Sequence, residues 1–91
     1  MTRVTATYQG RVQGVGFRAS VMALAGFHNI TGFVRNEDDG TVLVVAEGSD
    51  SEVRRFLDSI ARSRLGPLIT QTDLAFGPAI GNFDCFDVRF G

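Results

Sequence analysis

The chain has 91 residues, of which 44% are hydrophobic, and its formal net charge is -1. Domains commonly hold on the order of 100 residues, so we expect a single domain over residues 1–91. The apolar share exceeds that of disordered segments and is sufficient for a packed core. Because nucleic-acid binding would be accompanied by a basic excess, the charge argues against a nucleic-acid partner.

Several kinds of chemistry are excluded by residues that the chain lacks. All nine residues counted as Lys plus Arg are arginines, so no lysine is available for a Schiff base or a P-loop. With one cysteine and one histidine, the chain can form neither an intramolecular disulfide nor a histidine-rich metal site. The longest apolar run, Val42 to Ala46, is far shorter than the ~20 residues of a membrane span. We expect a cytoplasmic protein with no metal, no cofactor and no membrane partner.

The first two predicted elements are a strand and a helix. Polar and apolar residues alternate over residues 3–9, which is typical of a half-buried strand. Apolar side chains then recur at helical spacing from Phe17 to His28, and Asn29 can close this helix in the left-handed conformation. Between strand and helix, three glycines fall within the seven residues 10–16, so the backbone there must bend sharply or be approached closely.

The rest of the chain predicts two more strands, a second helix and two final strands. These elements cover residues 30–35, 41–47, the segment between Ser49 and Gly66-Pro67, 69–76 and 83–90. Asp39-Gly40 suits a tight hairpin, which makes the middle strands antiparallel neighbours. Ser49 and Glu52 form a capping box for the second helix. The order predicts an α+β fold, the ferredoxin-like βαββαβ sandwich, with two helices on one face of an antiparallel sheet and a short extra C-terminal strand.

The segment from Val12 to Arg18 is the main candidate site. It leads into a helix start, where unpaired N–H groups and the positive end of the helix dipole favour an anion. Its glycines allow successive amides to point inward, and the Arg18 guanidinium can add a bidentate bond to phosphoryl oxygens. The segment predicts a phosphate site formed by Arg18 and by the backbone of Gln13, Gly14, Val15, Gly16, Phe17 and Arg18.

No side-chain nucleophile faces the predicted anion. Val12 occupies the position at which thiol phosphatases of similar spacing have a cysteine, so we expect water to attack. Asn36, at the end of the following strand, supplies a carboxamide oxygen that can accept a hydrogen bond from that water. Since an amide is not a base, the substrate must carry a good leaving group. This requirement points to acyl phosphates and away from phosphate monoesters.

Other interpretations of these segments are weaker. The residues Gly14 to Ala19 also match G-x-G-x-x-A, with the acidic residues 37–39 about twenty residues later. A dinucleotide fold needs a parallel sheet and a second half, which this length and the Asp39-Gly40 hairpin disfavour. An RNA-binding sheet would need surface aromatics on its central strands, and Val42 to Ala46 has none. The glycine loop alone is also compatible with a tight strand-to-helix connection.

Two motifs together resemble a known family over nearly the whole chain. The run Gly-Arg-Val-Gln-Gly-Val-Gly-Phe-Arg at residues 10–18 and the run Gly-Phe-Val-Arg-Asn-Glu-Asp-Asp-Gly-Thr-Val at residues 32–42 strongly resemble the acylphosphatases. The resemblance implies metal-free hydrolysis of a small-molecule acyl phosphate to a carboxylate and inorganic phosphate. It further implies that Arg18 and the amides of residues 13–18 bind the phosphoryl group, while Asn36, beside Arg18, orients the water. A catalytically silent anion-binding or regulatory domain of the same fold is the alternative.

A few remaining residues carry expectations of their own. Phe90-Gly91 keeps the terminal aromatic of the family and adds one residue, which leaves open a contact between the chain end and Arg18. His28 is expected to be a partly buried structural residue, and Cys85 a small core residue. Apolar side chains such as Met22 and Phe27 lie off the main stripe of the first helix and offer an oligomer contact, but we expect a monomer.

Overall fold

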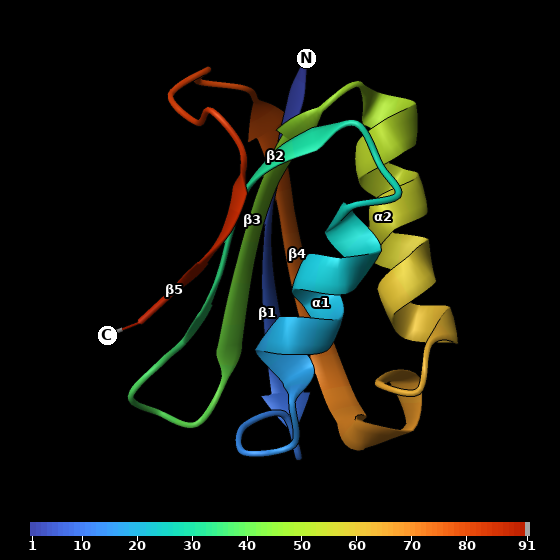
Figure 1. Ribbon diagram of the computed structural model, residues 1–91, viewed down its shortest axis with the longest axis vertical. Coiled ribbons are helices and arrows are strands. Elements are labelled where there is room, and N and C mark those ends of the chain that lie inside the picture. The colour runs from blue at the N-terminus through green and yellow to red at the C-terminus, as the bar shows by residue number, and fades with distance from the viewer. Residues whose placement is uncertain (91) are drawn as a thin grey trace.

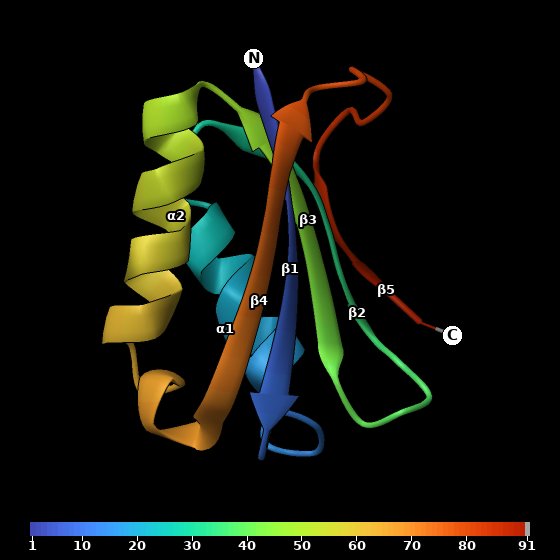
Figure 2. The ribbon, with the colours of Figure 1, turned by 180° about the vertical axis from the view of Figure 1, so that it is seen from behind.

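The computed structural model describes residues 1–90. The elements, in chain order, are β1 (Thr2–Gly10), α1 (Phe17–Ala25), β2 (Ile30–Asn36), β3 (Val42–Gly48), α2 (Asp50–Arg62), a 3-10 turn η1 (Gly66–Leu68), β4 (Ile69–Pro78) and β5 (Phe86–Arg89). Both helices lie on the same face of the sheet (Figure 1), and the view from behind shows α1 behind β4 and β1, with α2 beyond the β4 edge (Figure 2). The predicted ferredoxin-like α+β fold is confirmed.

The sheet has the strand order β4-β1-β3-β2-β5. The contacts β1 with β3, β1 with β4 and β2 with β3 are antiparallel, as predicted. β5 instead pairs in parallel with β2, with Gly32 opposite Phe86 and Arg35 opposite Arg89, so the five-stranded sheet is mixed. The reason is geometric. Residues 79–85 reverse the chain after β4, and β2 already runs opposite to β4, so the reversed strand is parallel to its new neighbour.

The core lies between the helices and the sheet. Alternate residues of β1 and β3 face inward and are fully buried or nearly so, and α2 adds three buried side chains on one stripe. These buried residues include Val4, Ala6, Tyr8, Val42, Val44, Ala46, Val53, Phe56 and Ile60. The ring of Phe56 meets that of Phe86 at a centroid distance of 5.4 Å, which attaches the short β5 to the core.

The end of α1 differs from the prediction. The helix ends at Ala25, and the next three amides, starting at Gly26, donate to carbonyls three residues back and form a tightened turn. Among residues 1–90 only glycines have a positive φ, so Asn29 does not take the left-handed conformation that the sequence suggested. Its amide donates instead to Glu52 Oε1 at 3.2 Å. A long-range contact with α2 therefore replaces the expected local cap.

The capping box at the start of α2 is only half formed. Ser49 Oγ accepts a hydrogen bond from the Glu52 amide at 3.2 Å, as expected. The Glu52 carboxylate does not return to Ser49 but bonds Asn29 and lies 3.9 Å from His28 Nδ1. His28 is partly buried against the ring of Phe56, in agreement with a structural role.

The last two strands differ in length from the prediction. β4 continues through Gly77-Pro78, which is compatible with proline because this strand lies at the edge of the sheet. β5 starts only at Phe86, three residues after the predicted Phe83. Residues 79–85 form the connection between opposite edges of the sheet.

A buried carboxylate holds this connection. Glu47 is only 4% exposed, and it accepts hydrogen bonds from the amides of Ile80 and Gly81, both at 2.9 Å, and from Arg3 Nε at 2.6 Å. Burial alone raises the pKa of Glu47, but the two amides and the Arg3 guanidinium outweigh it and hold the pKa below its ordinary value of 4.5. The ionised carboxylate thus helps to fix the path of the chain toward β5.

The depressed pKa predicts how stability depends on pH. A group with a lowered folded-state pKa contributes stability above its ordinary pKa and loses it as the pH falls through the folded-state value. Glu47→Gln should therefore lower the free energy of unfolding at neutral pH, and the difference from the wild type should shrink well below pH 4.5. Urea denaturation at both pH values measures this. Asp58→Asn, which removes an exposed ion pair with Arg62, should change little at either pH. A Glu47→Gln deficit that is equal at both pH values would contradict the assignment.

Candidate active site

The loop between β1 and α1 turns the chain at one end of the sheet (Figure 1). Gly14 and Gly16 have φ values of +75° and +76°, in the left-handed region that disfavours residues with a Cβ. Gly16 is also the N-cap of α1, and it provides no side-chain cap. The loop conformation therefore depends on these glycines, and the helix begins with its amides uncapped.

The amides of this loop are available to a ligand. Within residues 1–90, no carbonyl or side chain accepts a hydrogen bond from the backbone N–H of residues 13–18. At the start of a helix such N–H groups carry a partial positive charge, which favours an anion.

A cavity of about 400 Å³ lies against the loop. Its lining residues are Val12, Gly14, Gly16, Phe17, Arg18, Ala19, Asn36, Val88 and Phe90. The cavity thus joins β1–α1, the end of β2 and the end of β5. Of the residues predicted for the site, Gln13 and Val15 are not part of this lining, whereas the other five are.

Arg18 lies in the first turn of α1 and is oriented by the end of β5. Its Nη1 donates to the Arg89 carbonyl oxygen at 3.3 Å, and its Cζ lies 4.6 Å from the centroid of the Phe90 ring. These contacts place the guanidinium at the cavity and engage only part of its five N–H donors. Whether the end of the chain contacts Arg18 depends on Gly91, which lies outside the described residues. Phe90 itself does contact Arg18.

Asn36 is the last residue of β2, and it lines the same cavity as Arg18. Its Oδ1 atom is buried and has no hydrogen-bond partner within residues 1–90. A buried acceptor without a partner is unfavourable, by about 1–3 kcal/mol in typical proteins, so it calls for a ligand or a water molecule. The structure therefore brings the two predicted side chains to one cavity.

The side chain of Gln13 has a function that sequence reasoning missed. Its Nε2 donates to the carbonyl oxygens of Glu37 and Thr41, at 2.8 and 2.9 Å. These carbonyls belong to the hairpin that directly follows Asn36, so Gln13 ties the glycine loop to the segment that presents Asn36. Only its backbone was predicted to matter, because sequence spacing does not reveal which distant carbonyls a side chain reaches.

The hairpin after Asn36 is stabilised locally. Asp39 accepts hydrogen bonds from the Thr41 hydroxyl at 2.6 Å and from the Thr41 amide at 3.0 Å, and these bonds lower the pKa of the Asp39 carboxyl. Gly40 alone in this turn has a positive φ, of +90°. The predicted hairpin is present, with residues 37–41 between β2 and β3.

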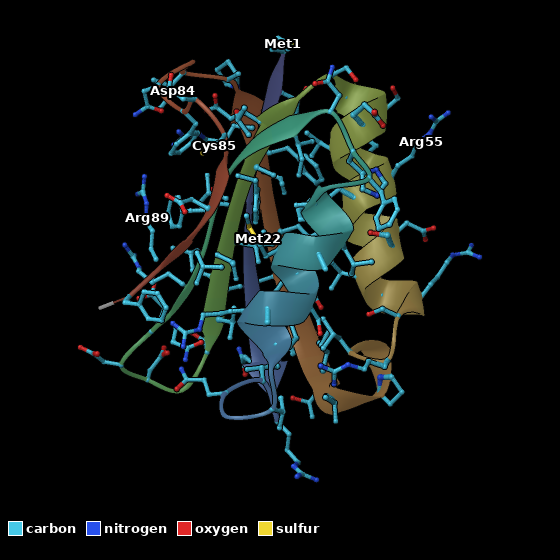
Figure 3. All side chains as sticks on the ribbon, viewed as in Figure 1. Met1, Met22, Arg55, Asp84, Cys85 and Arg89 are labelled. Atoms are coloured by element: carbon cyan, nitrogen blue, oxygen red, sulfur yellow. The ribbon has the colours of Figure 1, made fainter. Side chains whose placement is uncertain are left out.

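The remaining nucleophilic or basic side chains lie elsewhere. Cys85 is exposed, on the segment before β5 and toward the opposite end of the molecule from the glycine loop (Figure 3), so its expected place in the core was wrong. Cys85 directly precedes the edge strand β5. Its carbonyl oxygen accepts a hydrogen bond from the Gly32 amide, and its side chain is exposed. Neither Ser20 nor His28 lines the cavity.

The described residues form neither a metal-ligand cluster nor a membrane-spanning helix. Among the described residues 1–90, no three His, Cys, Asp or Glu side chains gather where they could share a metal ion. Neither helix in this range has the length and apolar character needed to cross a membrane.

The glycine conformations give a test of the loop. Gly14→Ala introduces a Cβ that meets no atom within 4 Å, so its effect comes from the positive φ alone. The variant should lose roughly 1–2 kcal/mol of stability if the loop keeps its shape, or weaken phosphate binding if the loop changes. Thermal unfolding and calorimetric titration with inorganic phosphate measure the two effects. Gly77→Ala also meets open space and has no positive φ, so it serves as the control. A Gly14→Ala protein with unchanged stability and phosphate affinity would show that the loop does not need glycine there.

Comparisons with known proteins bear on this site. The family model described as acylphosphatase matches residues 4–88. Among curated relatives, the acylphosphatase of Methanospirillum hungatei is 44% identical over 98% of both chains. That of Bacillus licheniformis is 38% identical over 89% of this chain and 90% of its own. The crystal structure of acylphosphatase from Bacillus subtilis superposes with a TM-score of 0.89 at 28% identity, covering 98% of this chain and 99% of that one. The chain belongs to the acylphosphatase family.

Proposed function

We propose that residues 1–91 act as one acylphosphatase domain, which hydrolyses the carboxyl–phosphate bond of a small-molecule acyl phosphate to a carboxylate and inorganic phosphate. One observation supports this most directly. Arg18 and Asn36 line one cavity together with Gly14, Gly16 and Phe17, whose backbone amides have no acceptor within residues 1–90. Family membership supports the same reaction.

Arg18 and the loop amides would bind the phosphoryl group. The amides donate to its oxygens from a fixed backbone, and the guanidinium adds charge-assisted bonds. In phosphoryl transfer these oxygens hold much of the transition-state charge, so donors that are already oriented lower the barrier without reorganising. A loop that is held in this shape before the substrate arrives would be suited to this task.

Asn36 would position the attacking water. Its Oδ1 can accept one hydrogen bond from a water molecule placed in line with the carboxylate leaving group. The water oxygen forms the new bond to phosphorus, the acyl oxygen departs with the bonding electrons as a carboxylate, and both water protons end on the oxygens of the inorganic phosphate. Because a carboxylate leaves readily without protonation, the site needs no general acid. A phosphate monoesterase would need a general base and a general acid. The proposed reaction needs neither, so the carboxamide of Asn36 is sufficient at this position.

The rest of the cavity would accommodate the acyl group. Val88 and Phe90 from the end of β5, together with Ala19 from α1, give the lining an apolar side next to the polar loop. We further propose a cytoplasmic monomer that requires no metal, cofactor or nucleic acid.

A hydrolysis assay tests the proposed function. The protein should hydrolyse benzoyl phosphate and acetyl phosphate, and excess chelator should leave the rate unchanged because no step uses a metal. Release of inorganic phosphate measures turnover. A protein that binds phosphate but turns over neither compound would support the alternative, a silent anion-binding domain. Loss of activity with chelator would contradict the metal-free reaction.

Two substitutions test the separate functions of Arg18 and Asn36. Arg18→Ala should weaken phosphate binding and lower kcat/KM by about 100- to 1000-fold, the usual effect of losing one oriented donor. Asn36→Ala should lower kcat while inorganic phosphate still binds. Steady-state kinetics and phosphate titration separate the two effects.

Matched controls come from exposed residues outside the cavity. Arg55 extends into solvent from α2 (Figure 3), so Arg55→Ala removes the same charge without touching the site. Asn82→Ala is the corresponding control for Asn36, since Asn82 contacts Arg3 on the exposed connection. If Asn36→Ala abolished phosphate binding and Arg18→Ala did not, the two functions would be reversed.

A further inference from the structure

We propose that Arg64 is a positioning residue for the glycine loop. Its guanidinium donates to the carbonyls of Val15 and Gly16, which fixes the direction of the Gly16 and Phe17 amides in the loop. The effect on catalysis rests on the proposed function, but the effect on anion binding does not.

Arg64 reaches the loop from a distant part of the chain. It lies after α2, in the segment that leads into η1, and a single atom, Nη2, makes all three contacts. It donates to Ser20 Oγ at 2.7 Å and lies 3.3 Å from the Val15 carbonyl oxygen and 3.5 Å from the Gly16 carbonyl oxygen. Since Nη2 has two N–H groups, at least one of them is shared between two acceptors. A Cβ built on Gly16 would come within 3.3 Å of the same nitrogen, so the guanidinium sits directly over this glycine.

Peptide geometry connects these carbonyls to the site. In a planar trans peptide, the C=O of one residue and the N–H of the next point in opposite directions. A donor on the Val15 carbonyl therefore fixes the direction of the Gly16 N–H. A donor on the Gly16 carbonyl fixes that of the Phe17 N–H. Both Gly16 and Phe17 line the cavity, and neither amide has an acceptor within residues 1–90.

The same contact joins the loop to the first turn of α1. The Gly16 carbonyl also accepts the Ser20 amide at 3.0 Å, which is the first hydrogen bond of the helix. Ser20 Oγ anchors the Arg64 guanidinium beside that bond. Arg64 thus stabilises the junction at which an irregular loop becomes a helix, and there two left-handed glycines give the backbone little rigidity of its own.

Unlike Arg54 and Arg62, Arg64 forms no ion pair with a carboxylate of residues 1–90. Arg54 and Arg62 on α2 form ion pairs with Asp50 and Asp58, one turn earlier in the helix. Within residues 1–90, Arg64 has no carboxylate partner, and its polar contacts are all with the loop and Ser20. Its positive charge is directed at the outer side of the anion site, where the exposed carbonyl oxygens would otherwise repel an approaching phosphate.

The binding of inorganic phosphate tests this proposal without requiring turnover. Arg64→Ala should raise the Kd for phosphate, measured by calorimetric titration, on the order of tenfold, within the hundredfold that a displacement of about 1 Å in a site can cost. Arg62→Ala is the matched control. It removes an equal charge two residues away, from an exposed ion pair, and should leave the Kd unchanged. Equal effects of both variants would overturn the proposal, since a general charge effect would then explain them.

Two more variants separate positioning from simple stabilisation. Arg64→Lys keeps the charge and one donor but lacks the planar fork, so it should restore part of the affinity. Ser20→Ala removes the anchor of the guanidinium, and its effect on the Kd should be smaller in the Arg64→Ala background than in the wild type. If Arg64→Ala lowered the Tm but left the phosphate Kd of the folded protein unchanged, Arg64 would be only structural and the proposal would fail.

Turnover measurements distinguish this proposal from the proposed function. With benzoyl phosphate, Arg64→Ala should raise KM by about the same factor as the phosphate Kd, because the same amides bind both. If the wild-type protein binds phosphate without hydrolysing benzoyl phosphate, the proposed function fails, while a weaker Kd in Arg64→Ala still supports the positioning by Arg64. A wild-type protein that does not bind phosphate overturns both.

Discussion

The site depends on one constraint, which is that the backbone amides from Gln13 to Phe17 must be left without acceptors where a helix begins. A helix start normally satisfies such groups with a capping side chain, but α1 has a left-handed glycine at its N-cap. Gly14 and Gly16 together allow a loop that residues with a Cβ would disfavour. The resulting set of donors is costly to keep in the absence of a ligand, so the surrounding structure must hold it in place.

Three distant parts of the chain provide this support. Gln13 links the loop to the hairpin after β2, Arg64 fixes its outer side from the end of α2, and the end of β5 orients Arg18. β5 in turn reaches its place because Glu47 holds the connection that follows β4. A carboxylate buried at one end of the sheet therefore contributes to the geometry of a site at the other end. This is a structural dependence, carried by the path of the chain.

Local patterns in the sequence predicted most elements and the two central side chains. Alternation and helical spacing are properties of neighbouring residues, so the strands, both helices and the glycine loop followed from them. Arg18 and Asn36 were predicted because each lies at the end of such an element, and both line one cavity in the structure. The parallel pairing of β5, the contact of Asn29 with Glu52 and the exposed position of Cys85 depend on which segments meet in space. Single-sequence patterns carry no signal for these, nor for the reach of Arg64.

The supporting hydrogen bonds share one chemical feature. Gln13, Arg18 and Arg64 all donate to backbone carbonyls, those of residues 37 and 41, residue 89, and residues 15 and 16. These three side chains therefore bond to backbone carbonyls and leave the backbone N–H groups of the loop for the ligand. Each carbonyl that is held outward turns an amide of the same peptide plane the opposite way. Among the buried side-chain nitrogen and oxygen atoms of residues 1–90, Asn36 Oδ1 is the one without a hydrogen-bond partner, and the proposed function assigns a water molecule to it. Under the proposed function, this separation of donors from acceptors supplies the anion site and the water site that hydrolysis would need within one cavity.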